Sequence, residues 1–157
     1  MRVLENISDF IYRIERVLIG FTVSIIFLAL ILEVIFRYFL NNPLEWSGEL
    51  AMYALIWTTF IGGSMSIKLK TATSITVLTD RLGTKLKRVL SLTTQIIVTL
   101  FCIFVLVYSL QWVLSPNTLI ERSLSMGVPM IIPYFGIPLG IGFMTIHSLY
   151  HLFNEVI

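Results

Sequence analysis

Four apolar segments, each about as long as a lipid bilayer is thick, constrain this chain more than any other feature of its sequence. They cover about residues 17–39, 46–67, 89–114 and 128–152. A helix needs roughly 20 mostly apolar residues to cross the hydrocarbon core. Only 13% of the residues are charged, whereas soluble domains carry about 25%. The sequence therefore predicts an all-α membrane protein, with four transmembrane helices in a single membrane domain, residues 1–157.

The distribution of Lys and Arg predicts the orientation of these helices. Basic residues are enriched in loops on the cytoplasmic side of a membrane. Of the 11 basic residues, three precede the first apolar segment and six lie in the connection 68–88. Only Arg37 and Arg122 lie at the opposite ends of the helices. We therefore expect both termini to be cytoplasmic.

Two segments outside the predicted spans have the apolar spacing of short amphipathic helices. In residues 1–16, and less clearly in residues 75–86, apolar side chains recur every three or four residues beside charged ones. Helices of this kind lie in the membrane interface. The basic loop 68–88 could either bind anionic lipid or contact a partner. The residues expected to anchor the chain to lipid are Arg13, Arg16, Lys68, Lys70, Lys85, Lys87 and Arg88.

An acid and a base stand one helical turn apart in the first apolar segment. Glu33 and Arg37 have the i, i+4 spacing, acid first, that favours an ion pair on a helix. Ionisable groups in a membrane are costly and are interpreted as functional by default. Three interpretations stay open: a structural ion pair, a contact with a partner subunit, or a step in ion translocation. Apolar segments 89–114 and 128–152 contain no acid that would continue an ion pathway.

The turn after this segment carries the signals of a helix start. Asn42 can cap a helix, Pro43 suits the first helical position, and Glu45 occupies the place of the acid in a capping box. We therefore interpret Glu45 as a local device of the helix N-terminus. Glu49, one turn further on, has no such local role.

Glu49 belongs instead to a stripe along the second predicted helix. Trp57 lies near the middle of that helix, where its indole N–H needs a partner, so we expect it to face protein. Trp46 fits the aromatic belt at the membrane–water interface. The residues of this stripe, spaced by three or four, are Trp46, Glu49, Tyr53, Trp57, Phe60 and Ser64.

Small residues mark two faces where helices can approach closely. Gly62 and Ser66 form one small-xxx-small pair, and Gly136 and Gly140 form another. Four helices can satisfy such faces among themselves. A bundle this small has little interior, however, so we expect some of these faces to meet another subunit.

The last predicted helix contains three prolines. Pro129 fits its first turn, and Pro133 and Pro138 should kink the helix or leave its outer half irregular. Broken helices build binding sites in some transporters. Few polar side chains surround this one, so a kink that shapes a docking surface is the better interpretation.

No catalytic or metal-binding motif occurs in the sequence. HExxH, GxSxG, CxxC and the phosphate-binding glycine loop are all missing. Ser, His and Asp do not converge in a recognisable pattern. His147 and His151 are spaced i, i+4 at the inner end of the last predicted helix, and the simpler interpretation is a position at the inner membrane interface. A haem bound by two histidines within the bundle would need facing helices, so we expect none. We therefore expect no enzyme activity, no cofactor and no metal site.

Four motifs occur in order along the predicted spans, and together they resemble one family. The first motif is Arg37-Tyr38-Phe39 together with Asn42-Pro43-Leu44-x-Trp46-x-x-Glu49-Leu50, and the second is Trp57-Thr58-Thr59-Phe60-Ile61-Gly62-Gly63. The third is Asp80-Arg81-Leu82. The fourth is Gly127-Val128-Pro129-Met130 with Tyr134 and Pro138-Leu139-Gly140. The chain resembles, over nearly its whole length, the small DctQ-type membrane subunit of tripartite ATP-independent periplasmic (TRAP) transporters. It departs from the family at Gly48, often an acid, and at 72–76, where the usual His and Asp are absent.

This resemblance implies a non-catalytic permease subunit in a bacterial inner membrane. In the family, a large M-type membrane subunit binds sodium and substrate, and a periplasmic P-type protein delivers an organic acid such as sialic acid or a C4-dicarboxylate. The residues expected at the large subunit are Glu33, Trp46, Glu49, Tyr53, Trp57, Gly62, Gly136 and Gly140. Those expected to face the binding protein are Arg37, Asn41, Asn42, Glu45, Glu121 and Arg122.

Two alternatives belong to other functional classes. The chain could be an autonomous four-helix transporter that couples efflux to protons through Glu33 or Glu49, or a small cofactor-binding bundle. Glutamine substitutions and the colour of the purified protein would separate these alternatives from a siteless subunit.

Overall fold

The computed structural model describes residues 2–69 and 84–156, and they form helices almost throughout. The long helices are α1 (Arg2–Tyr38), α2 (Glu45–Lys68), α4 (Thr84–Val113) and α6 (Ile131–Val156). A short helix, α5 (Pro116–Ile120), follows α4. The four long helices are each apolar and long enough to cross a membrane. The predicted all-helical fold with four spans is thus confirmed by length and composition.

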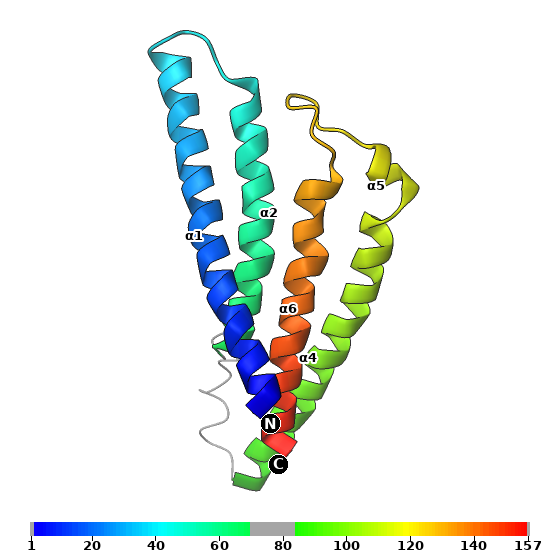
Figure 1. The fold of residues 1–157 in the computed structure, drawn as a ribbon. Coiled ribbons are helices and arrows are strands. Elements are labelled where there is room, and N and C mark those ends of the chain that lie inside the picture. The colour runs from blue at the N-terminus through cyan, green and yellow to red at the C-terminus, as the bar shows by residue number, and fades with distance from the viewer. Residues whose placement is uncertain (1, 70–83, 157) are drawn as a thin grey trace.

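The helices lie in a row, in the order α1, α2, α6, α4. Neighbours in this row pack against each other, whereas α1 and α6 make only limited contact. Figure 1 shows the helices close together at the end where both termini lie and farther apart at the end that carries α5. We call these the inner end and the outer end. The bundle is therefore V-shaped, with its closed side at the inner end.

The predicted amphipathic segment 1–16 and the first predicted span form one continuous helix. Arg2–Tyr38 is one helix of 37 residues. No proline interrupts this segment, and the apolar spacing of its first turns continues without a change of phase. The helix also packs one polar face inward, because Ser8 and Glu15 are fully buried. The surface location of residues 1–16 stays a prediction, and most of 75–86 lies outside the described residues.

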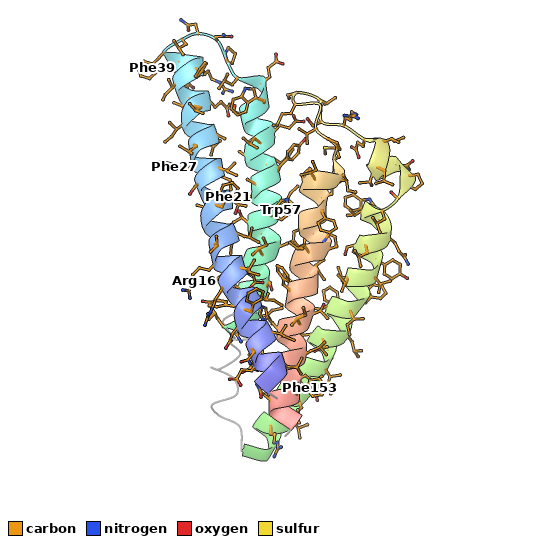
Figure 2. All side chains as sticks on the ribbon, in the orientation of Figure 1. Arg16, Phe21, Phe27, Phe39, Trp57 and Phe153 are labelled. Carbon is orange, nitrogen blue, oxygen red and sulfur yellow. The ribbon has the colours of Figure 1, made fainter. Side chains whose placement is uncertain are left out.

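Two glycines bring α6 very close to α2. A Cβ atom added at Gly136 would lie 2.9 Å from the ring of Trp57, and one at Gly140 would lie 2.6 Å from Cβ of Phe60. Such distances are shorter than real Cβ contacts, so only glycine permits this approach. Figure 2 places Trp57 on the side of α2 that faces α6. The prediction that Trp57 faces protein is confirmed, and the protein it faces is its own chain.

The prolines leave α6 helical, and a kink in it stays a prediction. Pro129 precedes the helix and pairs with Arg122 in an isolated antiparallel bridge, so the prediction that it sits in the first turn was wrong. Pro133 lies in the first turn, where a missing N–H costs nothing. The helix then runs unbroken through Pro138. The predicted irregular outer half is therefore absent from Ile131–Val156, the part of the chain that forms α6.

Candidate interaction surfaces and a buried polar cluster

The outer turn between α1 and α2 begins with a left-handed residue. Asn41 has a φ of 50°, a conformation that asparagine tolerates better than most residues. The backbone N–H of Asn42 then donates to the carbonyl of Phe36 at 3.0 Å. The residue before α2 is Leu44, and no side chain among the described residues caps that helix. The prediction of Asn42 as the cap was wrong, because the turn places Asn42 two residues before Leu44, which is the residue at the cap position.

The ion pair predicted within α1 is present. Arg37 donates to Oε1 of Glu33 through its Nη2. The side chain of Glu33 is 19% exposed and that of Arg37 is 53% exposed. Glu33 points toward α2, since a Cβ added at Gly48 would lie 4.0 Å from its Oε2. The pairing is confirmed, and a contact of Glu33 with another subunit stays a prediction.

Glu49 holds the loop that precedes α6. Its carboxylate accepts the hydroxyl of Ser123 at 3.0 Å, the backbone N–H of Leu124 at 3.1 Å and the backbone N–H of Ser125 at 3.2 Å. A carboxylate readily accepts several hydrogen bonds from successive backbone N–H groups. Sequence reasoning missed this role, because the partners lie 74 to 76 residues away.

The other residues of the predicted stripe on α2 also contact the chain itself. Tyr53 is buried and donates its hydroxyl to Sδ of Met130 at 3.2 Å. Ser64 is fully buried, whereas Trp46 is partly exposed near the outer end. Gly62 faces α1, since an added Cβ would lie 3.8 Å from Ile19. Large-subunit contacts of the stripe and of Gly62, Gly136 and Gly140 stay predictions.

A cluster of polar side chains fills the inner end, where α1, α2 and α6 meet. Nδ1 of His147 lies 2.8 Å from Oγ of Ser8, and its Nε2 lies 3.2 Å from Oε2 of Glu15. Ser8, Glu15 and His147 are each 0% exposed. Lys68 donates to Ser8 at 2.8 Å and pairs with Asp9 at 2.7 Å. This cluster joins residues that are up to 139 positions apart.

Proton positions in the cluster follow from its donors. The Lys68 ammonium can only donate, so Ser8 accepts from it. We assign the Ser8 hydrogen to Nδ1 of His147, which leaves Nε2–H to donate to Glu15. Oε1 of Glu15 has no hydrogen-bond partner among the described residues.

The cluster bears on two predictions. His147 and His151 were expected at the inner membrane interface; they lie in the inner end and are buried in the bundle, 0% and 6% exposed, and their depth in the membrane stays a prediction. A serine, a histidine and an acid do converge, with Glu15 as the acid, whereas the sequence pattern indicated no such arrangement. All three side chains are shielded from solvent, so a substrate could not reach the hydroxyl. The cluster is a structural element of the bundle rather than a catalytic triad.

A second polar network joins α4 to α6. The side-chain amide of Gln95 donates to the hydroxyl and the carbonyl of Ser148 at 2.8 and 2.9 Å. Thr99 lies 2.7 Å from the same hydroxyl. Hydrogen bonds between polar side chains help to hold helices together in a membrane.

The basic residues predicted to anchor the chain in lipid divide into separate groups. Arg13, Arg16 and Arg88 are exposed. Lys68 is only 13% exposed, and its ammonium lies 4.3 Å from the ring centre of Tyr150. The prediction of Lys68 as a lipid anchor was wrong, because Asp9 and Ser8 draw it into the inner cluster. Lys70 and the side chains of Lys85 and Lys87 lie outside the described part of the chain.

The residues predicted to face a binding protein share the outer end. They are all exposed, and Arg122 also donates to the carbonyl of Gly127 at 3.2 Å. Below them, between α1, α2 and the start of α6, lies an apolar groove of about 330 Å³. Its walls include Phe21, Tyr53, Trp57 and Ile132.

Comparison with known proteins identifies the family. Residues 26–157 match the family described as "Tripartite ATP-independent periplasmic transporters, DctQ component". The sialic acid TRAP transporter small permease protein SiaQ of Vibrio cholerae is 28% identical over 153 residues, 96% of this chain and 86% of that protein. The ectoine TRAP transporter small permease protein TeaB of Halomonas elongata is 24% identical over 98% of this chain and 78% of its own length.

A third relative is a much longer protein. The isethionate TRAP transporter permease protein DctMQ of Oleidesulfovibrio alaskensis is 23% identical over 71% of this chain but only 18% of its own length. Subunits of the DctQ type act together with M and P components. The chain belongs to the DctQ family, the small, non-enzymatic, multi-pass permease subunits of TRAP transporters in the bacterial inner membrane.

Proposed function

We propose that this subunit braces the large membrane subunit of a sodium-coupled TRAP symporter and presents its outer end to the periplasmic binding protein. The observation that carries the proposal is the match to the long DctMQ permease, of which the matched segment is 18%. A small-permease sequence joined to a much longer permease in one chain supports a lasting contact between the two. Sodium and substrate are then expected to bind the partner subunit.

Orientation follows from the charges. Arg2, Arg13 and Arg16 belong to the N-terminal part of α1, Lys68 ends α2 and Arg88 lies near the start of α4, and these helix ends lie at the inner end of the molecule (Figure 1). We place this end and both termini in the cytoplasm, so the outer end faces the periplasm. Exposed Arg13, Arg16 and Arg88 would then lie near anionic lipid headgroups.

The proposed substrate is an organic acid, with sialic acid as the first candidate and a C4-dicarboxylate as the second. The similarity to the sialic acid permease subunit over 96% of the chain supports this order. Other relatives are named for ectoine and isethionate, so membership of the family does not by itself define the substrate class.

The first test is assembly followed by transport. This chain, with an affinity tag, is co-expressed with the candidate large subunit, purified, and reconstituted with the binding protein under an inward sodium gradient. We expect the large subunit to co-purify and uptake to require all three components. Uptake of equal rate without this chain, or uptake by this chain alone, would refute the proposal.

The alternative, an autonomous proton-coupled transporter, predicts that Glu33 or Glu49 carries protons. In the structure Glu33 is paired with Arg37 and Glu49 with residues 123–125. If either acid carried protons, its glutamine variant would abolish pH-driven transport by the isolated chain. We expect the isolated chain to show no such transport in the first place.

A further inference from the structure

The segment 121–130, which we call the outer loop, folds back on itself. Ser123 donates its backbone N–H to the carbonyl of Val128 at 2.9 Å, and Met130 donates to the carbonyl of Glu121 at 3.0 Å. Gly127 closes the turn with a φ of 66°, a conformation that favours glycine. The Ser123 hydroxyl accepts the backbone N–H of Met126 at 3.0 Å. The loop therefore has a defined shape of its own.

Glu49 attaches this folded loop to α2. The three loop groups that donate to its carboxylate belong to consecutive residues at the loop tip, Ser123, Leu124 and Ser125. Glu49 lies on the second turn of α2, and Tyr53, one turn further along, reaches Met130 at the other end of the loop. One helix thus holds the loop at two points.

The loop tip presents an apolar side chain among polar ones. Leu124 is 100% exposed, although both of its neighbours are tied to Glu49. Glu121, Arg122 and Ser125 around it are also exposed. An apolar anchor with a polar rim is the usual anatomy of a contact with a soluble protein. A loop that is already ordered also loses less entropy on binding than a mobile one.

We propose that Glu49 is a positioning residue that latches the outer loop, and that the latched loop, with Leu124 as its apolar anchor, docks the periplasmic binding protein. The inference rests on the proposed function, because it requires a tripartite transporter with its outer end in the periplasm. It differs from a contact between Glu49 and the large subunit, since the carboxylate is already used within the chain.

The latch is tested in the assembled complex by hydrogen exchange of residues 121–130. Glu49→Gln keeps the size of the side chain but replaces one acceptor oxygen with an amide donor facing the backbone N–H groups. We expect exchange at Leu124 and Ser125 to rise at least about fivefold, and Ser123→Ala to have a similar effect from the loop side. Because the two changes break one latch, their effects should not add.

Glu45→Gln, one turn away, is the matched control for exchange. Unchanged exchange in Glu49→Gln would overturn the latch.

Docking is tested by measuring uptake against the concentration of substrate-loaded binding protein. We expect Glu49→Gln and Leu124→Asp to raise the half-saturating concentration several-fold, with an unchanged rate at saturation and unchanged sodium dependence. Leu124→Asp should raise this concentration without faster loop exchange, and Glu5→Gln at the inner end should leave uptake unchanged.

An unchanged half-saturating concentration would overturn the docking role. Loss of the large subunit from purified Glu49→Gln complex would overturn it in favour of assembly, whereas failure of the wild-type complex to assemble would refute the proposed function itself.

Discussion

At the scale of single residues, the least expected feature is a fully buried acid beside a fully buried histidine. Both Glu15 and His147 are 0% exposed, and neither stands out in the sequence as a core residue. Burial of an ionisable pair is favourable only when its hydrogen bonds are made, and removal of one partner leaves an uncompensated group. Ser8 and Lys68 supply part of what this pair needs.

This predicts a strong dependence of stability on the pairing. His147→Leu should destabilise the subunit by about 3 kcal/mol, because it leaves Glu15 buried without its donor. The double variant Glu15→Leu with His147→Leu should cost less than the single one, since an apolar pair can replace a buried polar pair. Unfolding in detergent, followed by tryptophan fluorescence, gives both values. Ser24→Ala, on the exposed side of α1, is the control, and a double variant less stable than His147→Leu would contradict the expectation.

At the scale of secondary-structure elements, the contact of α2 with α6 depends on glycine. An added Cβ at Gly140 would meet Cβ of Phe60 at 2.6 Å and its carbonyl carbon at 2.7 Å, and a backbone atom cannot move away as a side chain can. At Gly20, on α1, an added Cβ would meet nothing within 4 Å. The two positions therefore differ in packing and not in helical propensity.

A glycine-to-alanine substitution should thus affect stability differently at the two positions. Gly140→Ala is expected to destabilise the subunit by roughly 2 kcal/mol, because α2 and α6 must separate. Gly20→Ala should be neutral or stabilising by up to about 1 kcal/mol, since alanine is the better helix former. Thermal unfolding of both variants measures the difference. Equal effects at the two positions would show that the helices are not in close contact at Gly140.

At the scale of the whole molecule, most of each span is left uncovered by the chain itself. Only 11% of the residues in the most apolar window of α1 and 17% of those in the window of α4 are buried, against 44% for α6. The reason is the row arrangement, in which α6 has a long helix on either side and α1 and α4 have one each (Figure 1).

We expect this difference in burial between the helices to appear as a difference in hydrogen exchange of the isolated subunit. In detergent, backbone hydrogen exchange should be slowest in α6 and faster in the outer halves of α1 and α4, because few contacts hold them. Adding the large subunit should slow exchange in the faces that it covers and raise the unfolding temperature. Uniform exchange along all four helices, unchanged by the large subunit, would contradict both this arrangement and the bracing role.

Only some contacts of the candidate site residues could be predicted from the sequence. The pair Glu33 and Arg37 was predictable, because one helical turn separates its members and the helix alone brings them together. The cap at Asn42 was predicted from a motif and was wrong, because the left-handed turn at Asn41 placed Leu44 before the helix instead. Glu49 was predicted to contact the large subunit, and its partners in the outer loop were not visible from α2 alone.

The sequence by itself determined the four membrane helices, because their length and apolar character depend only on neighbouring residues and on the thickness of the bilayer. Tertiary structure alone decided which polar groups meet. Ser8 contacts His147 across 139 positions, and Glu49 contacts Ser123 across 74. No local periodicity encodes such pairs, since they depend on the order of the helices in the row and on glycines that set how closely two helices approach.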